Sequence, residues 1–460
     1  MTMNRVAVLN VVALSPNLIG EHTPAIAELA ARCGGVQVMS TPTPAVTTTV
    51  QTSMLTGATV SEHGIVANGW YDRTAGEIRF WKQSNRLVQA EPVWRTARER
   101  DPGFTCANVC WWYAMNSELD VYVTPRPIYR SNGRKVPDCL TRPGSLRDEL
   151  QSRHGTFPLF RFWGPGADIT STRWITDAAL DVEERFRPTL ELVYLPHLDY
   201  CLQKLGPGHP DIPRHLREVD AEVARLLERF DREGVEVLLV SEYGIEPVTS
   251  GVALNRTLRE HDLLRIRDEL GREMLVPDEC EALAIADHQV AHVYVRDRAR
   301  IAAVRTLIES VEGVDRVLGP DEMDRAGLGH ERSGDLLAIS EPDRWFTYDW
   351  WLDEDRAPDY ARTVDIHSKP GYDPRELFMS SRLRAAWKLM LMKAGIRTTL
   401  DVIPLDDRLV RGSHGRSDPA PGFEALIIGE GIGEDGPLPC TRVKDVILEK
   451  IFDTTSGKLS

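Results

Sequence analysis

A run of hydroxyl side chains between Thr43 and Ser53 is the first group in the chain whose type and spacing could do chemistry. Thr47, Thr48 and Thr49 are well placed to cap the start of a helix, because a hydroxyl oxygen accepts a hydrogen bond from a free N–H of the first turn. A helix N-terminus also attracts anions such as phosphate. A threonine there can act as a nucleophile when a metal or a base assists the loss of its proton. A capped helix without a catalytic role explains the same residues.

Side chains that bind divalent metals occur at three other places in the chain. His197 and Asp199 directly follow one apolar run, Glu242 and Tyr243 follow another, and His414 lies in a glycine-rich turn near the end. Imidazole nitrogens and carboxylate oxygens are ligands for zinc and related metals. Each motif alone also fits a simpler structure, namely a surface His–Asp pair, an ordinary turn and an exposed loop histidine.

Two further polar motifs stay open between a structural and a functional role. Alternation along an extended strand would place His288 and His292 on the same side. A hydrogen-bonded structural role is favoured for His292, whereas Asp287 and His288 fit either packing or ligand binding. Residues 365–373, which include His367, could supply substrate contacts from a cap, but an exposed Pro-Gly turn is the favoured interpretation.

The elements that must position these side chains are predicted from the apolar pattern. Runs rich in β-branched residues at 6–14, 190–195 and 235–240 predict strands. Residues 213–233 carry apolar side chains at helical spacing with charges on the other face, which predicts a long amphipathic helix. The same strand-to-helix alternation recurs as a strand over 282–295 followed by a helix over 298–311. The chain is therefore predicted to form a wound α/β sheet of parallel strands, in which ligands collect at the carboxyl ends of the strands.

The length of 460 residues is sufficient for one large α/β domain with insertions or for two domains. We expect a single domain over residues 1–460, with cap insertions at 70–165 and 345–399, where the alternation of strands and helices is weak. Both stretches carry several tryptophans. Their rings either line a substrate cleft or pack the caps onto the sheet.

Composition and charge exclude several classes of protein. The chain has 55 Lys+Arg against 69 Asp+Glu, a net charge of −14, which argues against a broad nucleic-acid-binding face. No apolar run approaches the ~18 residues that cross a bilayer, so no membrane segment is predicted.

Residues 6–14 are interpreted as a first strand rather than a signal peptide, because Asn10 interrupts them. Seven scattered cysteines do not suggest a disulfide framework, and a cytoplasmic protein is expected. The sequence makes no prediction of the oligomeric state.

Together, these motifs have a specific order along the chain. They are Leu14-Ser15-Pro16, Thr47 ten residues before Gly57, His63-Gly64-Ile65-Val66-x-Asn68, Trp70-Tyr71-Asp72, Val193-Tyr194 leading to Asp199, Gly206-Pro207, Glu242-Tyr243-Gly244, Gly334-Asp335-Leu336 leading to Glu341-Pro342, and Gly412-x-His414-Gly415. In this order they resemble the type I phosphodiesterase and nucleotide pyrophosphatase family of the alkaline phosphatase superfamily, which also includes phosphonoacetate hydrolases. The resemblance spans roughly residues 5–420.

The resemblance implies a three-layer α/β/α sandwich of alkaline phosphatase type and a metal-dependent hydrolase of phosphoester or phosphodiester bonds. Family members hold two divalent metals, usually zinc, and a threonine attacks phosphorus to form a phospho-enzyme intermediate. Carried over by position, Thr47 corresponds to the nucleophile and Asn68 to a phosphate contact. Asp199 and His414 correspond to metal ligands. One or two ions, zinc or manganese, and a small phosphorylated substrate are expected.

The chain also departs from the family pattern at four metal-ligand positions. Val12 stands where a first-strand aspartate is expected, Glu242-Tyr243 replaces an Asp-His pair, and Gln203 replaces a histidine. Three interpretations follow. The metal shell is rearranged, with Tyr243, His197 or the pair Asp287–His288 recruited; a single metal at Asp199 and His414 supports different chemistry; or the protein is a non-catalytic protein that binds a ligand or a partner. The hydrolase is the favoured interpretation, and its substrate is left open.

Overall fold

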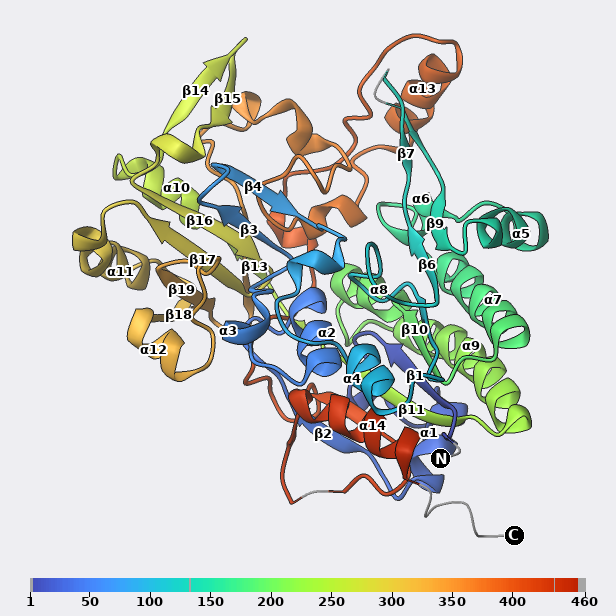
Figure 1. The fold of residues 1–460 in the computed structure, drawn as a ribbon. Helices are drawn as coiled ribbons and strands as arrows, with labels where there is room; N and C mark the ends of the chain where they lie inside the picture. Colours follow the sequence, from blue (N-terminus) through green and yellow to red (C-terminus); the bar gives the residue numbers. More distant parts are fainter. Residues whose placement is uncertain (1–2, 132–133, 434, 454–460) are drawn as a thin grey trace.

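A nine-stranded sheet forms the centre of the computed structural model, which describes residues 3–131, 134–433 and 435–453 (Figure 1). The strands in spatial order are β23 (Leu438–Pro439), β2 (Gln37–Ser40), β22 (Ala425–Ile428), β11 (Glu236–Ser241), β1 (Val6–Val11), β10 (Leu190–Leu195), β5 (Cys106–Val109), β6 (Val121–Pro125) and β9 (Cys139–Arg142). The five strands from β11 to β6 are parallel to one another. The predicted parallel α/β sheet is therefore confirmed at its centre, and β22 and β9 run antiparallel to it.

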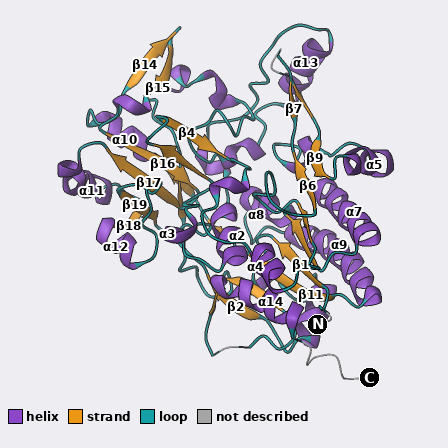
Figure 2. Cartoon of the chain, viewed as in Figure 1, coloured by secondary structure: helices purple, strands orange, loops and turns teal. Residues whose placement is uncertain are grey.

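Helices cover both faces of this sheet, which makes three layers (Figures 1 and 2). On one side lie α1 (Pro24–Arg32), α5 (Ser145–His154), α6 (Leu159–Phe162), α7 (Ile169–Phe186), α8 (His197–Leu205) and α9 (Ile212–Glu233). On the other side lie α2 (Thr47–Thr56), α4 (Val93–Arg100) and α14 (Val443–Phe452). The predicted helix over 213–233 is confirmed as α9, whose apolar face is buried against the sheet layer because its apolar side chains recur at helical spacing.

A second, four-stranded antiparallel sheet stands beside the first and has its own hydrophobic core. Its strands in spatial order are β16 (Ala282–Asp287), β17 (Val290–Val295), β19 (Leu336–Ser340) and β18 (Val314–Leu318), and α3 (Val60–His63), α10 (Leu254–Glu260), α11 (Ile301–Glu309) and α12 (Pro320–Arg325) flank it. The smaller strands are β3 (Gly69–Asp72), β4 (Glu77–Phe80), β7 (Ile128–Tyr129), β8 (Lys135–Val136), β12 (Glu246–Pro247), β13 (Ser250–Val252), β14 (Ile266–Glu269), β15 (Arg272–Leu275), β20 (Arg344–Phe346) and β21 (Gly412–Ser413).

The expectation of one long strand over 282–295 was wrong. The chain reverses at His288 and Gln289 to form a hairpin, in which β16 and β17 pair antiparallel. His288 adopts the left-handed conformation (φ 61°) that a two-residue hairpin turn requires. A connection of two residues is too short to return the chain to a parallel position, so this second sheet is antiparallel. His288 and His292 consequently do not share one strand face.

The two expected cap insertions are integrated more closely than the sequence indicated. Residues 70–165 contribute β5, β6 and β9 to the central sheet, so this stretch is not a separate cap. In residues 345–399, Trp350 and Trp351 are fully buried in the hydrophobic core of the four-stranded sheet, whereas α13 (Arg382–Lys393) protrudes at the top of the molecule beside β7 (Figure 1). For these two tryptophans, packing is the correct interpretation.

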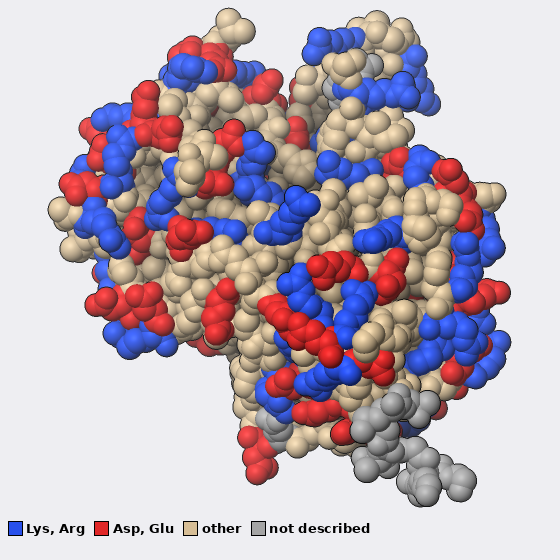
Figure 3. All heavy atoms as spheres, viewed as in Figure 1, with Lys and Arg blue, Asp and Glu red and all other residues tan. Residues whose placement is uncertain are grey.

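The surface carries both signs of charge over the face shown in Figure 3, where basic and acidic side chains are interspersed. This face has no broad basic area of the kind that nucleic-acid binding needs. Within the described residues, none of the helices combines the length and the apolar character that a membrane span requires.

His292 on β17 is a buried structural histidine, as the sequence analysis favoured. Its Nδ1 accepts a hydrogen bond from the backbone N–H of Gly334 at 3.1 Å, and its Nε2 donates to the carbonyl of Val66 at 3.1 Å. Since both ring nitrogens are used by the neutral ring, protonation breaks one of these bonds. Burial lowers the pKa of His292 to about 4.

We expect this histidine to make the protein less stable in mild acid. An unfolded histidine has a pKa of ~6.5, so between about pH 6.5 and 4 the unfolded state binds the extra proton and stability falls as the pH falls. Each bound proton changes the free energy of unfolding by ~1.4 kcal/mol per pH unit. His292→Gln should flatten the fall between pH 6.5 and 4.5 by about that slope, measured by denaturant unfolding. His261→Gln, at an exposed position, should keep the wild-type slope, and an equal slope in both variants would contradict the prediction.

Candidate active site

Thr47 is the first residue of α2, which starts at the carboxyl-end edge of the central sheet. The N-cap residue is Val46 in an extended conformation, so the expectation that a threonine caps the helix was wrong by one position. The threonine hydroxyls are used otherwise: Thr48 Oγ1 donates to the carbonyl of Ala67 at 3.0 Å. The Thr47 hydroxyl is buried and lies 3.1 Å from the phenol oxygen of Tyr243. Thr47 is thereby held at a helix start, where free N–H groups can receive an anion.

Tyr243 links Thr47 to Asp199. Its hydroxyl donates to Asp199 Oδ1 at 3.2 Å, which leaves the Thr47 hydroxyl as the donor to Tyr243. The Tyr243 ring stacks flat on the imidazole of His414, with centroids 3.5 Å apart and an interplanar angle of 6°. Tyr243 follows β11, Asp199 follows β10 and Thr47 follows β2. These three strands run in the same direction, so their carboxyl ends bring the three residues to one edge of the sheet.

Asp199 and His414 present two metal-binding atoms to each other. His414 Nε2 lies 3.8 Å from Asp199 Oδ1. The other nitrogen, Nδ1, lies 2.8 Å from the carbonyl of Ala45 and therefore carries the proton of the neutral ring. His414 Nε2 is buried and has no hydrogen-bond partner in the described part of the chain. Burial raises the pKa of Asp199 to about 7, against the opposing effect of hydrogen bonds from Gln203 and Tyr243.

Glu242 is buried at the end of β11 among amide side chains. Asn10 and Gln51 both donate to its Oε1, while Oε2 has no partner within the described residues. Burial raises the pKa of Glu242 to about 8. Val12, at the place of the family's first-strand aspartate, is fully buried and offers no ligand atom. This half of the site therefore keeps one carboxylate and has two amides in its surroundings.

Asn68 approaches from the loop before β3, and the pair Asp287–His288 approaches from the β16–β17 turn of the second sheet. Asn68 Oδ1 accepts from the Thr48 backbone N–H at 3.1 Å, and its Nδ2 donates to Asp287 Oδ1 at 3.2 Å. His288 Nδ1 lies 2.7 Å from the same Asp287 oxygen, and its ring centroid lies 3.8 Å from that of His414. Asp287 and His288, whose role the sequence left open, thus lie at the site and orient Asn68.

Residues 365–373 do not form the exposed turn that the sequence favoured. Tyr372 is buried, stacks on His288 at 3.6 Å, and donates to Gln203 Oε1 at 2.8 Å. His367 lies away from these residues, with Nδ1 3.4 Å from the carbonyl of Phe80. Sequence reasoning missed Tyr372 as a site residue, although the mixture of His, Lys, Tyr and Asp in this segment was a usable signal.

His197 is not part of this group, and its recruitment into the metal shell is not supported by the geometry. Successive residues of a helix are rotated by ~100°, so His197 and Asp199, two positions apart on α8, point in nearly opposite directions. The His197 ring faces α9, where Nε2 lies 3.0 Å from His215 and 3.2 Å from Glu218.

The charge balance of the site favours a bound cation. Asp199, Glu242 and Asp287 are all buried, and among the described residues none forms an ion pair with lysine or arginine. Burial raises the pKa of all three, because a charged carboxylate loses its hydration. A divalent cation beside Asp199 and the free lone pair of His414 Nε2 would offset this cost. Two donor atoms, Asp199 Oδ1 and His414 Nε2, are therefore available to one cation, whereas the amides around Glu242 suit a second cation poorly.

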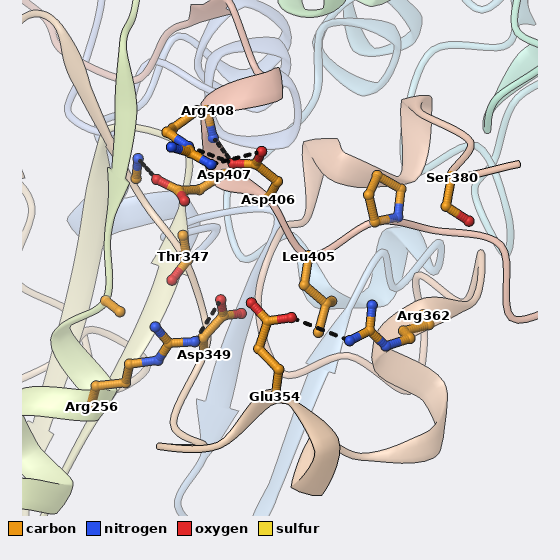
Figure 4. Close-up of a pocket in the computed structure, with 13 residues that line it drawn as sticks. Arg256, Thr347, Asp349, Glu354, Arg362, Ser380, Leu405, Asp406, Asp407 and Arg408 are labelled. Carbon is orange, nitrogen blue, oxygen red and sulfur yellow. Dashed lines mark hydrogen bonds and ion pairs between the residues drawn. The ribbon is translucent and has the colours of Figure 1, made fainter.

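A separate cavity of about 430 Å³ lies between β13 and the segments around residues 347–362 and 404–408 (Figure 4). Its charged side chains are paired with each other: Arg408 with Asp406 at 2.9 Å, and Arg362 with Glu354 at 3.3 Å. Since these charges satisfy one another, the cavity does not present a free set of cationic groups to a ligand. It contains none of the residues that surround Thr47.

Comparisons with known proteins agree with this architecture. A sequence profile described as type I phosphodiesterase / nucleotide pyrophosphatase matches residues 6–373. An uncharacterized pyrophosphatase/phosphodiesterase of Schizosaccharomyces pombe is 23% identical over 237 residues, which are 49% of this chain and 41% of that protein. The match therefore spans less than half of this curated relative.

Two solved structures are similar over nearly the whole chain. Phosphonoacetate hydrolase from Sinorhizobium meliloti 1021, in complex with phosphonoformate, has a TM-score of 0.63 and 16% identity, covering 97% of this chain and 95% of its own. An inactive variant of murine ectonucleotide pyrophosphatase / phosphodiesterase 5, in complex with AMP, has a TM-score of 0.58 and 12% identity, covering 97% and 94%. At these identities the likeness shows the fold, and the profile match shows the family. The chain belongs to the type I phosphodiesterase / nucleotide pyrophosphatase family of enzymes.

Proposed function

We propose that this protein is a divalent-metal-dependent hydrolase of phosphoester or phosphodiester bonds in small phosphorylated molecules, with Thr47 as the nucleophile. The observation that carries the proposal is the chain of contacts from Thr47 through Tyr243 to Asp199, next to the free His414 Nε2. The family is one of phosphodiester and pyrophosphate hydrolases, and the two structural relatives are described with AMP and with phosphonoformate.

In this proposal Asp199 and His414 hold one cation, for which zinc suits the mixed oxygen and nitrogen donors and manganese is the alternative. When bound, a divalent cation stabilises negative charge that develops on phosphoryl oxygens. Glu242 and Tyr243 occupy the place of a second cation's ligands. The two amides on Glu242 and the apolar Val12 favour one cation over two.

The remaining roles fall to groups of the chain itself. Tyr243 accepts the Thr47 proton in a hydrogen bond and so fixes the direction of the attacking oxygen. Asn68 Nδ2 carries two hydrogens and donates one of them to Asp287. The other hydrogen is donated to a non-bridging phosphate oxygen of the substrate. The free N–H groups and the partial positive charge at the start of α2 also attract the phosphate. Thr47 is thereby aligned with a phosphorus atom, which is a large part of the catalysis of phosphoryl transfer.

The second candidate function is ligand or partner binding without turnover. It is favoured by the hydrogen bonds on Asp199, because Gln203 and Tyr243 already donate to its two oxygens. In this alternative the neutral network replaces the metal centre. A small phosphorylated ligand would then bind at Asn68 and at the start of α2 without being hydrolysed.

Substitution of Asp199 by Asn distinguishes the two functions, because it keeps the shape and removes the charge that holds the cation. For the full chain purified without chelators, we expect the bound metal to fall by one equivalent. Hydrolysis of bis-p-nitrophenyl phosphate should fall by ~100-fold or more, the usual effect of losing a group that acts in the transition state. Asp211→Asn, at an exposed position before α9, is the matched control and should change neither. Wild-type protein without turnover, or Asp199→Asn with undiminished turnover, would contradict the proposal.

We also propose a reducing compartment such as the cytoplasm for this protein. All seven cysteines lie among the described residues, and each is a free thiol, six of them buried. Persistent free thiols are typical of reducing compartments.

A further inference from the structure

The helices α8 and α9 pack against each other outside the candidate active site (Figure 1). Four side chains of metal-binding type lie at their interface. His197 and Cys201 come from α8, and His215 and Glu218 come from α9. The ligand atoms of His197, Cys201 and His215 all lie within 4.8 Å of one another. Glu218 Oε2 lies 3.2 Å from His197 Nε2 and 3.4 Å from His215 Nδ1. The ligand atoms of His197, Cys201 and His215 therefore surround one point, and the Glu218 carboxylate lies beside the two histidines.

The spacing of these residues explains why they converge. His197 and Cys201 are four apart and His215 and Glu218 are three apart, so each pair lies on one face of its helix. His197 and Cys201 are buried, whereas His215 and Glu218 are partly buried. The cluster lies at the helix interface, and its α9 side is the less buried one.

The donor set matches that of a structural zinc site. Zinc binds thiolate, imidazole and carboxylate ligands in a tetrahedral shell of four. With bonds of ~2.0–2.3 Å, the ligand atoms of such a shell stand a little over 3 Å apart. The contacts among His197, His215 and Glu218, at 3.0 to 3.4 Å, already have this separation. Only the Cys201 sulfur must move closer.

A hydrogen-bonded cluster without metal is the competing interpretation. Arg214 donates to His215 Nε2 at 3.0 Å, which places the ring proton on Nδ1, directed toward His197 and Glu218. Metal binding would move that proton to Nε2 and turn Arg214 away. Arg214 is exposed and also pairs with Glu218 Oε1 at 3.0 Å, so its contact with His215 can be exchanged for water. The interpretation without metal gives the Cys201 thiol no part in the cluster. Among the described residues, the thiol donates to the Leu198 carbonyl of its own helix.

We propose that His197, Cys201, His215 and Glu218 bind one zinc ion that fastens α8 to α9. Binding releases the thiol proton of Cys201 to solvent and involves no redox change. Because α8 also carries Asp199 and Gln203 on its other side, the ion would hold the active-site face of this helix in position. The proposal is independent of the proposed hydrolytic function, since it depends on different side chains.

Cobalt is a suitable probe, because a thiolate ligand gives Co²⁺ a charge-transfer band in the near ultraviolet that nitrogen and oxygen ligands do not give. The full chain, stripped of metal with a chelator and titrated with Co²⁺, should develop this band with one equivalent bound. Zinc should then displace the cobalt and abolish the band. The candidate active site offers no cysteine among its described residues, so cobalt bound there does not produce this signal.

Two variants test the assignment of ligands. Cys201→Ser should lose the band, whereas Cys33→Ser, at a half-buried thiol just after the end of α1, should keep it. His215→Asn should weaken cobalt binding by ~10- to 100-fold or more, since loss of an outer-shell partner alone has an effect of that size. Asp199→Asn should keep the full band, which separates this site from the proposed catalytic one.

The proposal is wrong if the wild-type chain gives no thiolate band, or if the band persists in Cys201→Ser. It is also wrong if His215→Asn binds cobalt as tightly as the wild type does. Should Cys201→Ser fail to fold, thermal unfolding of the wild type and of His215→Asn gives the answer. Zinc is expected to raise the unfolding temperature of the metal-free wild type by more than that of His215→Asn, which keeps only the proposed site at Asp199 and His414, and an equal rise in both would also overturn the proposal.

Discussion

Thr47→Ala is expected to reduce hydrolysis of bis-p-nitrophenyl phosphate by about 10,000-fold or more, because removal of a covalent nucleophile leaves only binding and electrostatic contributions. Thr47→Ser keeps a hydroxyl at the start of α2 and should retain measurable turnover. The readout is kcat at saturating substrate, together with the binding of AMP, which the Ala variant should keep since Asn68 and the backbone of α2 are unchanged.

Thr49→Ala is the matched control for this experiment. Thr49 lies on the same helix and is fully buried, and its hydroxyl has no hydrogen-bond partner in the described part of the chain. Its substitution removes the same atoms from α2 and should leave turnover within a few-fold of the wild type. Undiminished hydrolysis by Thr47→Ala would remove Thr47 from the proposed role, and equal losses in the two variants would indicate damage to the helix instead.

Arg375→Met is expected to lower the free energy of unfolding by ~3–5 kcal/mol, the usual effect of removing one partner from a buried ion pair. Arg375 is fully buried and donates two parallel hydrogen bonds to Asp349, each 2.7 Å long, and a third to Asp373 at 2.7 Å. Lys369 lies 2.8 Å from both Asp373 and Glu376. Without the guanidinium, Asp349 and Asp373 would remain buried with too little positive charge, although Met fills much of the volume.

The measurement is guanidinium chloride unfolding followed by tryptophan fluorescence. Arg408→Met is the control, because Arg408 pairs with Asp406 at an exposed position and should change stability by no more than ~1 kcal/mol. A fall in the free energy of unfolding below about 1 kcal/mol for Arg375→Met would show that the buried ion pairs around Arg375 do not stabilise the fold. Because Asp373 follows Tyr372, we also expect the variant to loosen the stacking of Tyr372 on His288 and to reduce turnover.

Much of the architecture follows from local patterns in the sequence. The apolar runs of β1, β10 and β11 and the amphipathic face of α9 are each encoded within a short segment, so their types were predicted correctly. The end of β1 differs from the prediction, since the strand stops at Val11 and Ala13 adopts a left-handed conformation (φ 63°). A run of apolar residues does not reveal where the chain leaves the sheet.

The candidate site was predictable in part for a topological reason. Residues in the segments that follow parallel strands lie at one edge of the sheet, which brings Asp199, Tyr243 and Thr47 together. The same reasoning failed for His197, because it identifies the helix and not the side of the helix that a residue faces. His197 and Asp199 are two positions apart on α8, so their side chains point in nearly opposite directions, and His197 faces α9 instead of the site.

By itself, the amino-acid sequence determined the fold class, the family and the strand ends that carry the candidate site residues, because these depend on local periodicity and on motif order. Only the tertiary structure decided that Tyr372 covers His288 and that Glu242 lies between Asn10 and Gln51. It alone placed His197 beside His215. Such contacts join residues far apart in the chain, and they form only where whole layers pack, so no local pattern encodes them.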